Sequence, residues 1–195
     1  MIDILIFASS KQNKNVEILK NYISNFLAQD NLSNYRCLSW KDHFSDQAAC
    51  KDENIWKILF DKATSLYQSN GYAIILMTFD DQAIIDNHYY RVPRSNTLVE
   101  YILCKCILKN DHLYCYIDRT DYPDTPLKLP SDLSGLYPQP ISMNDASLKD
   151  VARVIVGYIR RGNAAASPAI APVSPQNPLK PEKRDLNDYI KNANV

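Results

Sequence analysis

Glycine is scarce in this chain of 195 residues, with only four, at positions 71, 135, 157 and 162. Phosphate-binding loops of dinucleotide-binding proteins and P-loop proteins need several glycines at fixed spacing, because the backbone must come close to the phosphate. Neither G-x-G-x-x-G nor G-x-x-x-x-G-K-[ST] occurs. The sequence therefore excludes both glycine-rich phosphate-binding motifs.

Metal-binding patterns are also missing. The three histidines, His43, His88 and His112, are isolated, and no Cys/His cluster has zinc spacing. We therefore expect no metal site and no bound cofactor. The five cysteines are odd in number and irregularly spaced, which favours a reduced, cytoplasmic chain over a disulfide framework.

The chain carries no excess charge of either sign, since 22 basic residues balance 22 acidic ones. This removes the electrostatic case for nucleic acid or an anionic membrane as the main partner. No apolar run approaches the roughly 20 residues that span a bilayer. The start, "MIDILIFASS", lacks the pattern of a signal peptide. We expect a cytoplasmic protein without a nucleic-acid or membrane partner.

Short apolar runs alternate with amphipathic segments along the first 161 residues. The apolar runs predict strands, and the segments with helical periodicity predict helices. The predicted strands are 2–7, 35–40, 72–79, 112–117 and a short edge strand, 136–141; the predicted helices are 15–28, 54–67, 95–108 and 148–161. Ser95 or Asn96 is the expected cap of the third helix. This order predicts an α/β fold with an open, mostly parallel, doubly wound, flavodoxin-like sheet of about five strands flanked by helices.

The composition changes abruptly after this alternating region. Residues 164–181 hold five of the eleven prolines and no aromatic residue. We predict a domain over residues 1–162, an extended proline-rich linker over 163–182 and a short tail over 183–195. The tail either docks on its own domain or a partner, or the natural protein continues beyond it.

Polar residues follow the predicted strands at the edge where ligands bind in parallel sheets, outside the carboxyl ends. We expect them to converge on one cleft. They are Ser9, Ser10 and Lys11 after the first strand, Trp40 after the second, Asp80 and Asp81 after the third, and then Arg94, Asn96 and Glu100 at the start of a helix.

Five short motifs occur in a fixed order: "ASS", "LSWKDHF", "AIILMTFDD", "RSNTLVE" and "LPSDLSGL". This series resembles the TIR-like nucleotide-binding domains of bacterial antiphage effectors, including those fused to STING or other cyclic-nucleotide sensors. The family pattern is roughly strand-GSS, W-x-D, DD, R-x-N-x-x-x-E-L-G and PSD-[IL]-x-G. The resemblance covers about residues 2–160 and implies the TIR fold.

The resemblance also implies an activity. Family members characterised as enzymes cleave the nicotinamide–ribose bond of NAD⁺, and the glutamate of R-x-N-x-x-x-E is their catalytic residue. In this sequence that glutamate is Glu100, and Arg94 and Asn96 match the other motif positions. The chain is thus expected to be an NAD⁺ glycohydrolase of bacterial immunity, or a cyclase, that is activated by self-association into a homo-oligomer or filament.

Glu100 has a chemical and a structural interpretation. A carboxylate can stabilise the oxocarbenium-like ribose that forms when nicotinamide leaves, and Asn96, four residues earlier, should share its helix face. Alternatively, Glu100 lies on a solvated stripe or pairs with Lys105 or Arg94.

The other candidates also have two interpretations. Ser9–Lys11 could hold phosphate or form a plain loop. Trp40 could stack on an aromatic base or finish the core. Asp80 and Asp81 could bind ribose hydroxyls or end a strand.

A second class of function stays open, a non-catalytic TIR-like module for nucleotide sensing or protein interaction. Ala8 stands where the family has glycine, and "EYILCKCILKND" replaces a segment that carries glycine after the glutamate. A missing glycine can narrow a site where backbone must approach a ligand.

Overall fold

The computed structural model describes residues 1–39, 42, 55–85, 87–118 and 139–166. One parallel five-stranded sheet has the order β2-β1-β3-β6-β7, formed by β1 (Ile2–Ala8), β2 (Tyr35–Ser39), β3 (Tyr72–Met77), β6 (Leu113–Asp118) and β7 (Gln139–Ile141). Its helices are α1 (Asn13–Gln29), α3 (Ile55–Gln68), α4 (Ser95–Ile107) and α5 (Asp145–Ala166). The predicted α/β fold is confirmed. In the described part of the chain, no helix is both long and apolar enough to cross a membrane.

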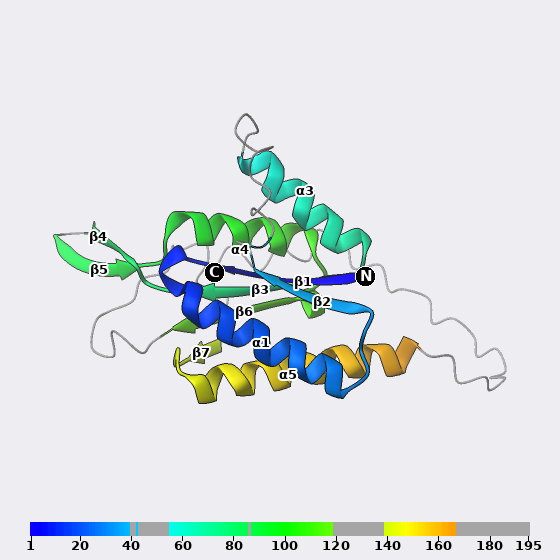
Figure 1. Ribbon diagram of the computed structural model, residues 1–195. Helices are drawn as coiled ribbons and strands as arrows, with labels where there is room; N and C mark the ends of the chain where they lie inside the picture. The colour runs from blue at the N-terminus through cyan, green and yellow to red at the C-terminus, as the bar shows by residue number, and fades with distance from the viewer. Residues whose placement is uncertain (40–41, 43–54, 86, 119–138, 167–195) are drawn as a thin grey trace, which may run out of the picture. The chain divides into compact units, whose positions relative to one another are not determined.

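The helices cover the two faces of the sheet in two layers, with α1 and α5 on one face and α3 and α4 on the other (Figure 1). Successive side chains of β1 point to opposite faces of the sheet, so β1 contributes to both apolar layers, as expected for a strand buried on both sides. Ile4 and Ile6 pack with α1 and α5, whereas Leu5 and Phe7 pack with α3 and α4. The core is therefore two apolar layers separated by the sheet.

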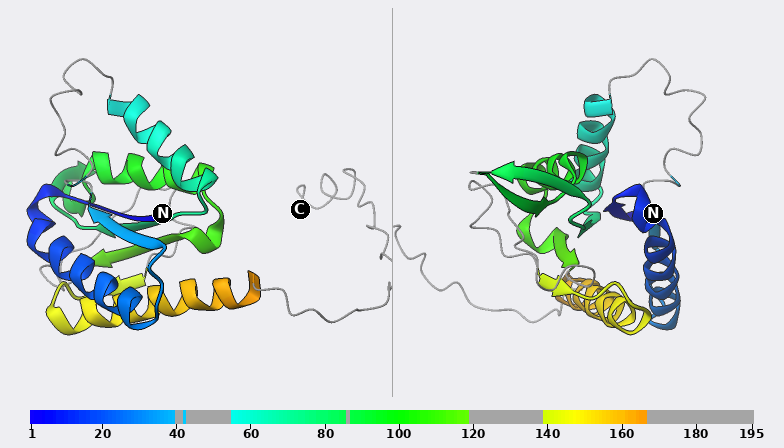
Figure 2. Two further views of the ribbon diagram at one scale, coloured as in Figure 1. Left: turned by 45° about the vertical axis from the view of Figure 1, so that its right-hand side comes forward. Right: turned by 90° about the vertical axis from the view of Figure 1, so that its left-hand side faces the viewer.

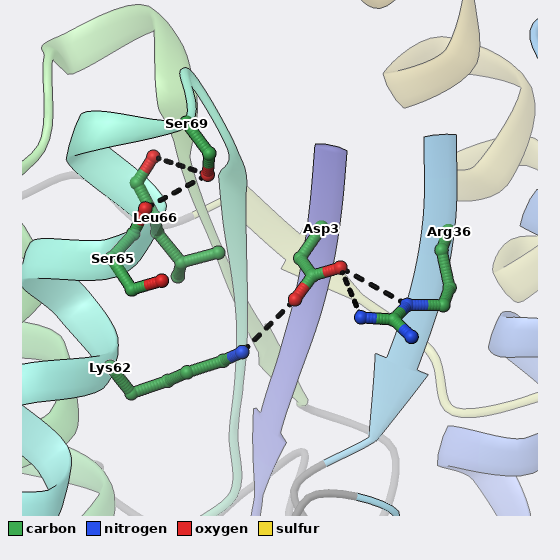
Figure 3. A network of polar contacts seen from close by, with 6 residues as sticks. All are labelled: Asp3, Arg36, Lys62, Ser65, Leu66 and Ser69. Atoms are coloured by element: carbon green, nitrogen blue, oxygen red, sulfur yellow. Dashed lines mark hydrogen bonds and ion pairs between the residues drawn. The ribbon is translucent and has the colours of Figure 1, made fainter. Parts of the chain in front are cut away.

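An ion-pair network joins three elements at the amino-terminal end of β1 (Figure 3). The carboxylate of Asp3 on β1 accepts hydrogen bonds from Arg36 on β2, at 2.9 and 3.1 Å, and from Lys62 on α3, at 3.0 Å. Burial alone would raise the pKa of Asp3, but the hydrogen bonds from Lys62 and Arg36 hold that pKa below its ordinary value. This network lies at the opposite end of the strands from the predicted site.

The chain turns sharply between α3 and β3. The Ser69 hydroxyl donates to the carbonyl oxygens of Ser65 and Leu66 at the end of the helix (Figure 3). The amide of Gly71 donates to the Leu66 carbonyl at 2.7 Å. A Cβ atom on Gly71 would lie 2.6 Å from the carbonyl oxygen of Asp3 and 2.8 Å from the Leu66 side chain. Only glycine fits this close approach of two backbone segments.

The edge strand β7 is shorter than the predicted strand 136–141, of which residues 136–138 lie outside the described residues. Among the strands that the structure describes, β7 pairs only with β6, and it contains Pro140 between Gln139 and Ile141. Proline has no amide hydrogen, so β7 does not present an unbroken row of donors, which is typical of an edge strand.

A β-hairpin lies between β3 and α4, where the sequence predicts only a loop. Its strands, β4 (Asp81–Ile85) and β5 (His88–Val92), pair antiparallel as a separate two-stranded sheet. Figures 1 and 2 show the hairpin extending away from the main sheet. Asn87 has a φ of 63°, and Asp-Asn between two β-prone runs is a turn signal that could have revealed the hairpin.

The last helix is longer at both ends than the predicted helix 148–161. It begins at Asp145, because the Asn144 side chain accepts a hydrogen bond from the Ser147 amide at 2.9 Å and so caps the first turn. It continues to Ala166, four residues beyond the predicted domain end at 162. The helix thus includes the first four residues of the predicted linker, 163–182; the remainder, 167–182, and the tail lie outside the described residues.

Candidate functional site

Buried polar side chains in the described part of the chain gather at the carboxyl ends of the strands and on α4. Four of them end or follow parallel strands, and the other two lie on α4. They are Ser39 on β2, Ser9 after β1, Thr78 after β3 and Asp118 on β6, with Thr97 and Glu100 on α4. This is the sheet edge at which ligands bind in parallel α/β proteins. Among the described residues, no group of three or more His, Cys, Asp or Glu side chains could hold a metal ion.

Glu100 is the one buried carboxyl on α4. The helix buries Thr97, Glu100, Tyr101 and Cys104 at the spacing of one helical face, and Glu100 is only 7% exposed. Its Oε2 atom has no hydrogen-bond partner among the described residues. Burial raises the pKa of Glu100 to about 8. The neutral acid therefore predominates at neutral pH while the site holds no cation.

The structural interpretation of Glu100, a solvated or ion-paired surface residue, is wrong. The Nε atom of Arg94 lies 3.8 Å from Oδ1 of Asp81, and the ammonium of Lys105 donates to Asn110 at 2.7 Å. Both cations named as partners thus point to other groups.

α4 begins at Ser95, as predicted, but its N-cap residue differs from the predicted one. Arg94 is the N-cap residue and its side chain makes no capping hydrogen bond, so the prediction of Ser95 or Asn96 as cap is wrong. Asn96 is exposed in the first turn, and Glu100 is buried one turn further along the helix. The first turn of α4 contains no acidic residue.

The two aspartates after β3 are bound to different neighbours. The Thr78 hydroxyl donates to Asp80 at 2.9 Å, which folds the chain back on the end of the strand. Asp81 begins β4 and pairs with Arg94 at the start of α4. Their carboxylates therefore join the end of β3 to the start of α4 across the hairpin, and ribose binding by them stays a prediction.

The residues after β1 form a short cap. Ser9 is buried and its hydroxyl accepts a hydrogen bond from the Lys11 amide at 3.3 Å, whereas Ser10 and Lys11 are exposed. Ser9 follows the last residue of β1 and is the N-cap of a short 3-10 helix, Ser10–Gln12.

Ala8, at the position of the family glycine, is the last residue of β1 and pairs in register with Leu76. The non-glycine residues with positive φ in the described part are Asn31, Asn70 and Asn87. The backbone at Ala8 is thus ordinary strand, and alanine fits it without strain.

The aspartate of the "SWKD" sequence has a role that the sequence reasoning did not assign. Asp42 accepts hydrogen bonds from the amide and hydroxyl of Ser39 at 2.8 Å, and the Asp42 amide donates to the Ser39 hydroxyl at 3.2 Å. This reciprocal pair is a capping box, whose S-x-x-[DE] pattern was readable in the sequence. Lys20 on α1 also donates to Asp42 at 2.9 Å.

The pKa of Asp42 is consistent with its contacts to Ser39 and Lys20. Burial alone would raise the pKa of Asp42, but the hydrogen bonds from Ser39 and Lys20 hold that pKa below its usual value. Trp40 and the "LPSDLSGL" segment lie outside the described residues.

A comparison with protein-family models matches residues 6–143 to the family described as CAP12/Pycsar effector protein, TIR domain. The match spans more than half of the chain and includes the end of β1, the DD segment and Glu100. A search of curated proteins finds no match. The fold, the strand-end polar residues and the family match agree: the chain belongs to the CAP12/Pycsar effector TIR-domain family, and so is a TIR domain of bacterial antiphage immune effectors.

Proposed function

We propose that this TIR domain is an NAD⁺ glycohydrolase with Glu100 as its catalytic residue. The observation that supports this best is the buried Glu100 carboxyl, whose Oε2 atom lacks a hydrogen-bond partner among the described residues. A buried acid without such a partner is costly, and such groups are concentrated at functional sites.

The reaction needs one carboxylate. The bond between ribose C1′ and the nicotinamide nitrogen breaks, its electron pair stays on nicotinamide, and nicotinamide leaves as a neutral molecule that needs no acid. The ribose becomes an oxocarbenium-like cation, which the ionised Glu100 stabilises. Water then adds to C1′ and releases a proton, so that ADP-ribose, nicotinamide and H⁺ are the products. In cyclisation, a nucleophilic atom of the same ADP-ribose takes the place of water.

The raised pKa of Glu100 fits a cationic substrate. In the empty site, burial favours the neutral acid. The nicotinamide ring of NAD⁺ carries a positive charge, and an opposite charge within about 4–6 Å lowers the pKa of a carboxyl. Substrate binding thereby generates the carboxylate that the reaction needs.

The remaining site residues receive roles as parts of this proposal. Ser9–Lys11 and Arg94 bind phosphate oxygens, Trp40 stacks on a base, and Asp80–Asp81 and Asn96 contact ribose hydroxyls. The domain acts in the cytoplasm, is active as a homo-oligomer or filament, and receives its signal from a sensor domain or partner protein through the C-terminal tail.

The first experiment compares nicotinamide release from NAD⁺ by wild type, Glu100→Gln and Glu17→Gln at high protein concentration, with and without crowding. Glu100→Gln keeps the shape and loses the charge, so its rate should fall by at least about 10²-fold, as expected for one preorganised electrostatic partner. Glu17 lies on α1 and pairs with Lys20 on the surface, so Glu17→Gln is the matched control and should react like wild type.

Glu100→Gln that turns over NAD⁺ at the wild-type rate contradicts the assignment of Glu100. A wild-type protein that releases no nicotinamide under any of these conditions instead supports the non-catalytic module.

A further inference from the structure

An ion pair closes the base of the hairpin. Asp81 begins β4, and Arg94, the N-cap residue of α4, comes shortly after β5 ends at Val92. The Nε atom of Arg94 lies 3.8 Å from Oδ1 of Asp81, which is longer than a hydrogen bond. The side chains of Arg94 and Asp81 are 35% and 43% exposed. A ligand can therefore reach both members of the pair.

The ion pair of Asp3 shows by contrast how weak this contact is. Asp3 accepts hydrogen bonds of 2.9 and 3.1 Å from Arg36 and of 3.0 Å from Lys62, and its side chain is only 15% exposed. A pair that is partly exposed and too long for a hydrogen bond shifts an equilibrium by no more than about fivefold. Arg94 can therefore leave Asp81 when a better partner binds.

Phosphate is a better partner for this guanidinium. An arginine can bind phosphate through two parallel N–H···O hydrogen bonds of about 2.7–2.9 Å. Once Arg94 has turned to a phosphate, the Asp81 carboxylate is free to accept hydrogen bonds, and ribose hydroxyls are suitable donors. Asp80 keeps its own partner during this change, because the Thr78 hydroxyl donates to it at 2.9 Å.

We propose that a nucleoside diphosphate, such as the ADP-ribose part of NAD⁺, binds by partner exchange: Arg94 turns from Asp81 to a phosphate, and Asp81 turns from Arg94 to a ribose hydroxyl. A ligand with both groups replaces both halves of the ion pair. Inorganic pyrophosphate takes Arg94 but leaves an unpaired carboxylate beside its own negative charge, which is unfavourable. Asp81 is thus a specificity-determining residue that favours nucleoside diphosphates over inorganic anions.

The test measures the affinity of the full chain for two probes, inorganic pyrophosphate and ADP-ribose, by isothermal titration calorimetry at about 0.15 M salt. The exchange rests on the proposed function for its ligand but not on cleavage, so binding is read without turnover. Asp81→Asn should bind pyrophosphate about three- to tenfold more tightly than wild type. The affinity for ADP-ribose should rise less, because the ribose loses its carboxylate acceptor.

Two controls separate the exchange from a general change of charge. Asp61→Asn removes the same charge from the surface of α3, where Asp61 pairs with Lys57, and should bind both probes like wild type. Arg94→Gln removes the cation that changes partner. In that background, Asp81→Asn should alter the affinity for pyrophosphate by less than about twofold. Melting curves of all variants establish that they are folded.

An equal gain of pyrophosphate affinity from Asp81→Asn with and without Arg94 would show that Asp81 merely repels anions, which overturns the exchange. An unchanged ratio of the two affinities in Asp81→Asn overturns it as well, and so does failure of both probes to bind. If the affinities change as expected but wild type releases no nicotinamide from NAD⁺, the exchange stands and only the cleavage proposal fails.

Discussion

At the scale of single residues, the unusual feature is a carboxyl group placed in an apolar layer. Glu100 lies on the buried side of α4 next to Tyr101, with Cys104 one turn further on. Burial, and then the nearby Glu100 charge, raise the pKa of the Cys104 thiol to about 12. Leucine or methionine at position 100 would suit this environment better for stability alone.

Glu100 should make the protein less stable as the pH rises. Its folded-state pKa of about 8 is above the ordinary value of 4.5, so folding is not penalised below about pH 4.5 and loses stability as the pH rises toward 8. The full effect is on the order of a few kcal/mol. Glu100→Gln should therefore melt at a higher temperature than wild type at pH 8, and the difference should shrink toward pH 5. Melting curves from pH 5 to 9 measure this, and a difference independent of pH contradicts it.

The ionisation of Glu100 should also appear in the pH dependence of the rate of NAD⁺ cleavage. The free enzyme must lose the Glu100 proton to react, so kcat/KM should rise about tenfold per pH unit below a pKa near 8 and level off above it. Because the cationic substrate lowers the pKa of the bound carboxyl, the kcat profile should rise at lower pH. Initial rates at limiting and saturating NAD⁺ give both profiles. Coincident profiles would show that NAD⁺ does not interact with this charge.

At the scale of elements, the sheet and its helices follow from sequence periodicity, because buried strands and amphipathic helices leave clear patterns. The helix ends and the hairpin do not follow from sequence periodicity. The cap of α4 is Arg94, which no capping preference favours, and α5 starts early because Asn144 caps it. The hairpin was missed because its two strands are partly exposed and lack a continuous apolar run.

Part of the candidate site could be predicted, because the predicted strands also give the positions of their ends. Strand ends mark the edge at which Ser9 and the aspartates lie, and the family motif marks Glu100. Ion-pair partners, such as Asp81 for Arg94 and Lys20 for Asp42, depend on tertiary packing and leave no pattern in the sequence.

Two glycines give a matched test of the packing of these elements. Gly71→Ala would place a methyl group against the Asp3 carbonyl and the Leu66 side chain and should cost about 1–3 kcal/mol. Gly157→Ala lies inside α5 with no atom within 4 Å of the new methyl, so it should stabilise the fold by about 0.5–1 kcal/mol. Urea unfolding measures the change in the free energy of unfolding of each variant, which should have opposite signs. Equal effects would mean that the turn before β3 relaxes freely.

At the scale of the whole molecule, the proposed self-association connects activity to protein concentration. If assembly activates the site, the specific rate of nicotinamide release should rise with protein concentration for wild type, by mass action. A concentration series for wild type at fixed NAD⁺ measures this dependence. A wild-type rate per molecule that does not change with concentration separates catalysis from assembly.

The proline in β7 limits how copies can join. Because Pro140 removes a backbone donor from the edge strand, a strand from another molecule cannot extend the sheet there by continuous amide pairing. Growth along that border by the cross-β route of amyloid is blocked, although the sheet interior is rich in β-branched residues. Any edge-to-edge pairing of main sheets would therefore have to use the opposite edge strand, β2, which contains no proline.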